Sequence, residues 1–303
     1  MAKFANPANP AGERQIVTGA ALVIIHLGAC AAVLPAFFSW SGVVVALVLY
    51  YLTGGLGICL GYHRLLTHRS MRLAQPLEYL CTIFGVLAMQ GGPINWVATH
   101  RAHHAFSDTE RDPHNSERGF WWCHIAWLYG RNPARLTRDE ERRYAADLAA
   151  DPVHSFFEAS AIWWQLALGL VLFAFGGWSW VVWGIFVRLV VTYHATWLVN
   201  SAAHLTGYRT YRAPGRDHSM NTWWVALVAW GEGWHNNHHA FPFSARHGMR
   251  WFEIDLTWWT IKVLAILRLA SDVQVPAPAM LQRRLREPAF PNASTGTGPR
   301  RAS

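Results

Sequence analysis

The sequence predicts an all-α integral membrane protein, with four transmembrane helices in two hairpins beneath a cytoplasmic helical cap. Three observations lead to this fold class. Hydrophobic residues make up 52% of the 303 residues and charged residues only 15%, whereas soluble domains carry about 25% charged residues. Several uncharged stretches have the length of roughly 20 residues that crosses a bilayer. Nearly all Lys and Arg residues lie between or beyond these stretches.

The first predicted hairpin combines the uncharged stretches 17–39 and 41–62, which are separated by a short break. The second combines residues 161–180 and 181–203, in which Arg188 is the charged residue. Each stretch can span the hydrocarbon core as a helix. We therefore expect four spans, joined in pairs by tight turns.

Residues 79–99 form a fifth uncharged stretch, which is a further candidate for a transmembrane span. Their apolar run ends at Met89, and a polar, glycine- and proline-containing segment follows at 90–95. Such a short run suits a helix that lies in the interface or within the protein better than a span.

Four spans and a cytoplasmic N-terminus place the polar segments 63–158 and 204–280 on the same side of the membrane. The positive-inside rule assigns that side to the cytoplasm, because these segments carry the Lys and Arg residues. The sequence thus predicts a single membrane domain over 1–280 with both termini in the cytoplasm. Residues 281–303 are basic and rich in Pro and Ser, and we expect them to be disordered.

Cysteine usage and net charge exclude other classes. The four cysteines form no CxxC pair, so they predict neither a disulfide framework nor a thiolate metal site. The formal net charge is +8, but no stripe of Lys and Arg alternates with aromatic residues, as it would in a nucleic-acid-binding protein.

Histidines cluster in three boxes within the polar segments. The second and third boxes share the spacing i, i+3, i+4, which places three imidazoles on one face of a helix. The first box has the spacing i, i+5, which separates its two residues by roughly 140° on a regular helix. Either the helix is distorted there or the two histidines serve different ions. The boxes are His63-Arg64-Leu65-Leu66-Thr67-His68, His100-Arg101-Ala102-His103-His104 and His235-Asn236-Asn237-His238-His239, and His204 is a ninth candidate ligand.

So many imidazoles predict two metal ions, because a structural zinc needs only four ligands. Imidazole alone accepts Zn, Cu, Fe or Ni, so the spacing does not identify the metal. Isolated histidines are more often surface or core residues, and His114 and His247 are expected to support ligands or the fold. The same structural interpretation applies to His26, His124, His154, His194 and His218.

These boxes resemble those of the integral-membrane fatty acid desaturases of the Δ9 branch (the stearoyl-CoA and acyl-lipid desaturases). The resemblance runs from about Tyr50 to Pro276, and the bacterial and plastid-type acyl-lipid Δ9 subgroup is the most similar. It includes the segments Asp-Pro-His-Asn at 112–115, Gly-Phe-Trp-Trp at 119–122, Asn-Ser-Ala-Ala-His at 200–204 and Gly-Glu-Gly-Trp-His at 231–235.

The resemblance implies an O₂-dependent enzyme of unsaturated fatty acid biosynthesis that inserts a cis double bond, at Δ9, into a saturated acyl chain. It implies a di-iron centre in the cap and a bent substrate tunnel that descends from it between the helices. Tyr51 and Gly55 correspond to positions that close this tunnel and set chain length. The implied iron ligands are His63, His68, His100, His103, His104, His204, His235, His238 and His239, with Asn200 acting through a water.

The acyl carrier is open between CoA and a lipid. In the acyl-CoA branch a basic and an acidic residue precede the second box, whereas this chain has Ala98 and Thr99 there. This difference favours a lipid-linked chain. The sequence contains no His-Pro-Gly-Gly motif of a fused cytochrome b5 module, so we expect a separate electron donor such as a ferredoxin or a cytochrome b5-type carrier.

Several polar residues near the boxes are candidates for supporting roles. Carboxylates usually orient metal-binding imidazoles. Arg64 and Arg101 could contact a head group or lie on the solvated surface. The candidate carboxylates are Asp108, Asp112, Asp217 and Glu232.

Two other functions fit parts of the pattern. Membrane di-iron hydroxylases and other lipid oxygenases use similar histidine-rich sites with different box spacing. A histidine-rich metal transporter would favour ionisable groups within the spans, where this chain offers Arg188, His26 and His194.

Overall fold

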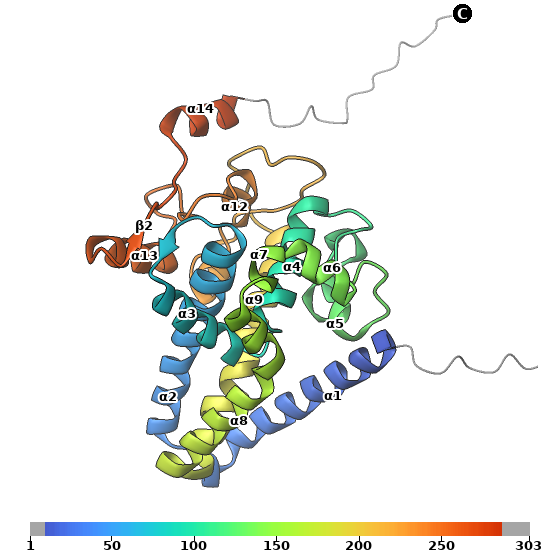
Figure 1. Ribbon diagram of the computed structural model, residues 1–303, viewed down its shortest axis with the longest axis vertical. Coiled ribbons are helices and arrows are strands. Elements are labelled where there is room, and N and C mark those ends of the chain that lie inside the picture. The colour runs from blue at the N-terminus through green and yellow to red at the C-terminus, as the bar shows by residue number, and fades with distance from the viewer. Residues whose placement is uncertain (1–9, 287–303) are drawn as a thin grey trace, which may run out of the picture.

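The computed structural model describes residues 10–286, and in this range helices predominate (Figure 1). Three helical segments are long and apolar enough to cross a membrane: Gln15–Val33, Trp40–Thr67 and Pro152–Leu205. The third has 54 residues and is interrupted at Gly177, whose φ of 60° and ψ of −155° are not helical. It therefore has the length of two spans, while the count of four remains a prediction.

The membrane segments contain the following elements. Ser39 begins the second segment by accepting a hydrogen bond from the Gly42 amide, and Asp151 caps the third through the Val153 amide. The elements are α1 (Pro10–Cys30), η1 (Ala31–Val33), η2 (Pro35–Phe37), α2 (Trp40–Tyr50), η3 (Tyr51–Thr67), α8 (Pro152–Val181), η6 (Val182–Val187), α9 (Arg188–Asn200) and α10 (Ala202–Leu205).

The stretch 79–99, which competed as a span, is divided between two short helices that meet at residues 88–92. Neither belongs to the three candidate spans of the described chain. The elements between the second and third segments are β1 (Arg72–Leu73), α3 (Gln75–Leu87), α4 (Pro93–Phe106), η4 (Ser116–Arg118), η5 (Trp122–Ala126), α5 (Trp127–Tyr129), α6 (Arg138–Tyr144) and α7 (Ala146–Ala149).

The last polar segment folds against the first. Strand β2 pairs antiparallel with β1, and this pairing joins residues about 200 positions apart in the chain. The elements of this segment are α11 (Trp223–Val228), α12 (His235–Ala240), α13 (Leu256–Ile266), β2 (Ala270–Ser271) and α14 (Pro278–Arg286).

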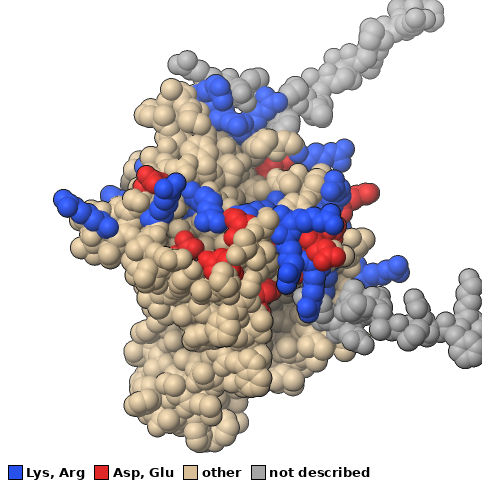
Figure 2. Space-filling model, viewed as in Figure 1, with Lys and Arg blue, Asp and Glu red and all other residues tan. Residues whose placement is uncertain are grey.

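The two ends of the molecule differ in their content of charged side chains. Helices α2 and α8 extend toward one end, where Figure 2 shows no charged side chains on the visible face. Lys, Arg, Asp and Glu gather at the other end, over the elements of the two polar segments. This division is the one expected of a membrane protein with a polar cap.

The largest buried core cluster surrounds η3 and positions the first histidine box. Tyr62, Leu65 and Leu66 are fully buried in it, together with apolar residues of α3 and α4. Gly57 of η3 approaches the backbone of Gly85 in α3 so closely that an added Cβ would collide with it. Close contact between these two helices therefore depends on glycine.

Candidate metal centre

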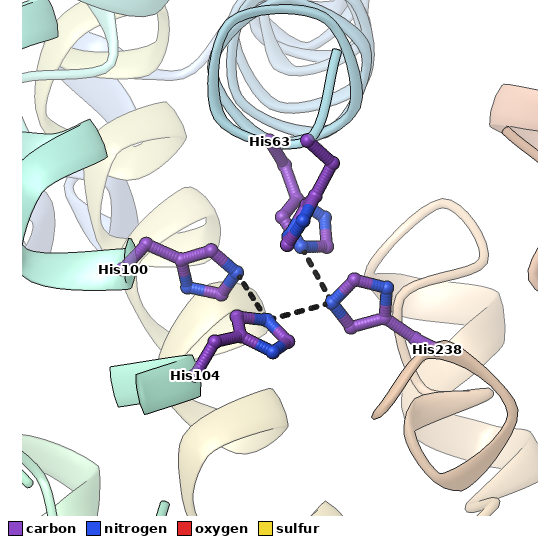
Figure 3. A group of neighbouring side chains, drawn as sticks. His63, His100, His104 and His238 are labelled. Atoms are coloured by element: carbon purple, nitrogen blue, oxygen red, sulfur yellow. Dashed lines mark hydrogen bonds between the residues drawn. The ribbon is translucent and has the colours of Figure 1, made fainter. Parts of the chain in front are cut away.

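The nine predicted histidines meet in two buried or half-buried groups. Figure 3 shows the first group, with His63, His100, His104 and His238 labelled. Within each group, one nitrogen from every residue lies within 4.8 Å of the others. The first group contains His63, His68, His100, His104 and His238, and the second contains His103, His204, His235 and His239.

Helices α4 and α12 each contribute to both groups. In α4 the i, i+4 pair His100 and His104 belongs to the first group and His103 to the second. In α12 the i, i+4 pair His235 and His239 belongs to the second group and His238 to the first. The two helices therefore lie between two metal-binding positions, and each presents two residues to one position and one to the other.

The first box lies on a distorted helix. Element η3 is a π-helix over its whole length, so its turns are wider than those of an α-helix. The His68 amide accordingly donates to the carbonyl of His63, five residues earlier, at 3.2 Å. Both imidazoles fall in the same group, so distortion of the helix, and not service to different ions, explains the i, i+5 spacing.

The Nε2 atoms of the groups face one another. In the first group His238 Nε2 lies 3.1 Å from His63 Nε2 and 2.9 Å from His104 Nε2. In the second group the Nε2 atoms of His204 and His235 are 3.0 Å apart. The buried Nε2 of His68 has no hydrogen-bond partner. Convergent imidazole nitrogens of this kind are a donor set suited to a transition metal ion.

Four carboxylates hold the opposite ring nitrogens, and they are the four proposed from the sequence. Glu232 lies 2.7 Å from His63 Nδ1, and Asp108 lies 3.0 Å from His204 Nδ1. Asp112 lies 2.9 Å from His103 Nδ1, and Asp217 contacts His239 Nδ1. A carboxylate at Nδ1 keeps the proton there and leaves the Nε2 lone pair free for a metal.

Burial keeps most imidazoles of the boxes neutral. It lowers the pKa of His100, His104 and His238 well below the ordinary value, and neighbouring histidines add to the effect. Burial would raise the pKa of Asp217, but His239 and His204 hold it well below its usual range. The site thus combines neutral ligands with ionised carboxylates behind them, which is the charge state that metal binding requires.

Arg64 has a different place from the one suggested by the sequence. Its side chain is fully buried and lies 2.9 Å from both Glu232 and Asp255, so it cannot reach a head group. Arg101 is partly exposed and is held at the surface by Asp147 at 2.7 Å and by the carbonyls of Leu66 and Tyr144. Both arginines of the first two boxes therefore make contacts within the protein, and Arg64 is the buried one.

Asp255 was missed by sequence reasoning. Its carboxylate binds Arg64 and also caps α13 by accepting from the Trp258 amide at 2.9 Å. An aspartate before an apolar run is a recognisable helix N-cap signal. The ion pair with Arg64 has no such signal, because 190 residues separate the two positions.

The other histidines take the supporting or structural places expected of them. His247 lies 3.0 Å from Glu232, and His114 packs on the ring of His103. His26, His194 and His124 form a hydrogen-bonded chain outside both groups. Among described residues, His154 lies near Asp151, and His218 contacts Glu117 on the surface.

Two neighbouring cavities are lined in part by histidines of the groups. One of about 50 Å³ is lined mainly by apolar groups, including Tyr50, Gly54 and Ile58. The other, of about 380 Å³, lies between α1, α4, α5 and α9. Residues shared by both linings mark the junction: Trp96, His100, Thr196 and Asn200.

Three hydrogen-bonded side chains lie at this junction: Gln90, Trp96 and Thr196. Gln90 donates to Thr196 Oγ1 at 2.9 Å and accepts from Trp96 Nε1 at 3.3 Å. These contacts fix the Trp96 ring beside His100, on which it stacks with centroids 5.1 Å apart. The boundary between the two cavities is therefore formed by hydrogen-bonded side chains next to the first group.

The two proposed tunnel residues lie one position away from the smaller cavity's lining. Tyr51 turns its hydroxyl toward Thr260, at 3.0 Å, and its ring packs against Trp230. Gly55 is buried beneath that ring, where an added Cβ would lie 2.9 Å from Tyr51 Cδ2. Tyr51 and Gly55 thus support the wall that Tyr50 and Gly54 form.

We expect Asp217→Asn to weaken metal binding by about 10- to 100-fold, the usual effect of removing a carboxylate behind a ligating imidazole. The amide cannot keep the proton on His239 Nδ1 as the carboxylate does. Metal content during titration with a chelator measures the change. Asp272→Asn, which alters an exposed ion pair with Arg72, is the control, and equal chelator resistance of the two variants would contradict the prediction.

Comparison with known proteins supplies a family. The model of the family described as "Fatty acid desaturase" matches residues 38–266. The chain is 56% identical over 251 residues to the sn-1 stearoyl-lipid 9-desaturase of Anabaena variabilis, covering 83% of this chain and 90% of the relative. It is 53% identical to the enzyme of the same name from Synechocystis sp., covering 83% and 78%. The sn-2 palmitoyl-lipid 9-desaturase of Nostoc sp. is 46% identical, with coverage of 80% and 85%.

Proposed function

The chain belongs to the fatty acid desaturase family, and from this premise we propose that it inserts a cis double bond at Δ9 into an acyl chain carried by a membrane glycerolipid. The observation that carries the proposal is that histidines of both groups line the smaller cavity, which shares His100 of the first group with the larger cavity. An acyl chain that passes from one cavity to the other places its middle carbons beside the groups.

We assign one iron to each histidine group, with Asn200 reaching one of the irons through a water. When bound, the irons supply the activation of O₂ that removal of hydrogen from methylenes requires, because no side chain is a strong enough oxidant. The protein's residues hold the ligands, orient the chain and exclude water. The nine imidazoles and four carboxylates fit this role by donor type and by orientation.

We expect the path of the acyl chain to bend at the hydrogen-bonded side chains of Gln90, Thr196 and Trp96. Gln90, itself bonded to Thr196, holds Trp96 in the lining shared by the two cavities, and a chain that passes from one cavity to the other would turn around the indole ring. A turned chain brings two neighbouring methylenes into a cis-like arrangement before reaction. Such positioning lowers the entropic cost of the chemical step.

A lipid carrier fits the larger cavity better than CoA. Its polar lining includes one cation, Arg135, and one anion, Glu141, with neutral amides, and it offers no cluster of basic groups for a multiply charged CoA. The named substrates of the three relatives are stearoyl-lipid and palmitoyl-lipid. We therefore assign a saturated, lipid-linked C16 or C18 chain, and electrons from a separate ferredoxin or cytochrome b5-type protein.

The proposed membrane arrangement has four spans, with Gly177 at the turn of the second hairpin and the histidine groups on the cytoplasmic side. Cysteines introduced for Arg72, Arg138 and Arg284, in a background with Cys30→Ser, should all react with an impermeant thiol reagent from the cytoplasm. Trp178→Cys, beside the turn, should react from the opposite side. Reaction of positions 72 and 138 from opposite faces would exclude this topology.

Gly55→Leu should shift the preference toward shorter acyl chains, because the added side chain displaces Tyr51 and Trp230 toward the smaller cavity. Tyr51→Ala should admit longer chains. Gas chromatography of the products measures both shifts, while the double bond stays at Δ9. Val48→Leu, on the exposed face of α2, is the control, and unchanged chain-length profiles in both folded variants would place the end of the path elsewhere.

Expression of the chain in a desaturase-deficient host tests the function as a whole. We expect new cis monoenes whose double bonds lie at Δ9 by mass spectrometry, in lipid-linked chains and with about two irons per purified protein. Hydroxylated chains in their place would indicate a membrane hydroxylase. Metal uptake without altered lipids would indicate a transporter.

A further inference from the structure

Helix α1 forms one wall of the larger cavity. Five of its residues line that cavity over slightly more than two turns: Val17, Thr18, Ala21, Leu22 and Ile25. The facing walls come from α4, α5 and α9, and Figure 1 shows α1 crossing the molecule obliquely, with its N-terminal end next to α5. The cavity is therefore closed on this side by a single helix.

The outer face of the same helix is apolar and exposed. Ile16 is 75% exposed and Leu27 is 67% exposed, and Val23 and Ile24 are exposed between them. Because these residues lie within the candidate span Gln15–Val33, their side chains face lipid when the protein is in a bilayer. One helix thus separates the hydrocarbon of the membrane from the cavity that leads to the histidine groups.

The two halves of α1 are attached differently. In the C-terminal half, Gly28 packs directly on the Phe186 ring. Beside it, His26 Nε2 lies 3.2 Å from His194 Nε2, the side-chain hydrogen bond that ties α1 to another helix in the described chain. The first turns of the cavity-lining half are less buried: Val17 is 67% exposed, and Gly19 lies beside Tyr129 of α5. Leu22 and Ile25, nearer to His26, are buried in a core cluster with residues of α9. The helix is therefore anchored more firmly from Leu22 onward than in the turns before it.

We propose that the N-terminal half of α1 is a lateral gate through which one acyl chain of a bilayer glycerolipid enters the cavity from the hydrocarbon layer. The helix pivots about Gly28 and His26 and separates from α5. This inference rests on the proposed function, since it takes the lipid-linked acyl chain as the occupant. A chain carried on a water-soluble head would have no need to cross this helix.

The geometry allows an engineered disulfide bond that holds the gate closed. An ideal Cβ at Gly19 would lie 3.6 Å from Tyr129 Cβ, within the range of about 3.5–4.5 Å found in disulfides. Gly19→Cys combined with Tyr129→Cys should therefore form a bridge under mild oxidation. The two single variants contain the same native cysteines and cannot form this bridge, so they are matched controls.

Two readouts test the gate. A phosphatidylcholine with a photoreactive diazirine acyl chain should label cavity peptides of the oxidised double variant at least tenfold less than those of either single variant. Reductant should restore labelling, and turnover of bilayer lipid should change in parallel. His26→Leu, which removes the tie to His194, should increase the rate of labelling and provides a test even if the double variant does not fold.

Full labelling of the locked protein, or an unchanged rate in His26→Leu, would overturn the gate. Labelling does not require turnover, so it separates this proposal from the function. If lipid enters and the lock excludes it while no monoene forms even in the wild type, the desaturase assignment fails and the gate stands.

Discussion

Replacing His238 by alanine is expected to reduce desaturation to less than about a hundredth of the wild-type rate and to remove iron from the first group. Its Nε2 faces both His63 and His104, so the substitution removes the nitrogen around which that group is arranged. Loss of one ligand also exposes the remaining ion to water and to exchange. Metal analysis of the purified protein and product analysis in cells measure the two effects.

The same outcome is expected for His63→Ala, His100→Ala and His204→Ala. His218→Ala is the control, because this half-exposed imidazole contacts only the surface carboxylate Glu117 among the ion pairs of the described chain. Wild-type iron content together with wild-type activity in His238→Ala would refute the assignment of the first group.

Arg64→Leu is expected to destabilise the protein by about 3–5 kcal/mol, the usual effect of removing one partner from a buried ion pair. The guanidinium is fully buried between Glu232 and Asp255, and its loss leaves two carboxylates without their cation. Glu232 also holds His63 and His247, so the metal group loses its support as well. Thermal unfolding in detergent, followed by size-exclusion chromatography, measures the loss.

The control for Arg64 is Arg72→Leu, because Arg72 belongs to an ion pair with Asp272 in which both side chains are mostly exposed. Exposed pairs contribute little to stability, so its melting temperature should equal that of the wild type. If Arg64→Leu also melts like the wild type, the buried network does not stabilise the cap.

The helical membrane class and the histidines that gather in the two groups could be predicted because both depend on local patterns. Uncharged apolar length predicts spans, and repeated i, i+3, i+4 spacing predicts groups of imidazoles on helices. The division of each box between two positions could not be predicted in this way. The spacing of residues in a helix shows which side chains lie on the same side. The assignment of His103 and His104 to different groups depends instead on where α12 and α10 pack.

The role of Arg64 illustrates a second limit of local patterns. An arginine between two histidines in a polar segment resembles a surface residue in every local respect. Its burial results from Glu232 and Asp255, which the chain supplies more than 160 residues later. Tyr51 and Gly55 lie next to, and not in, the lining of the smaller cavity for a related reason: wide turns in η3 change which side chains point inward.

The wide helix η3 also has a consequence for how such chains change by insertion and deletion. His68 follows His63 by five positions, and the π-helical turn brings the two residues to one group. Deleting one residue between them would give the spacing i, i+4, which a regular α-helix also places on one side. The length of this box can therefore differ by one codon between genes whose products bind the same ions, provided that the helix changes its winding in compensation.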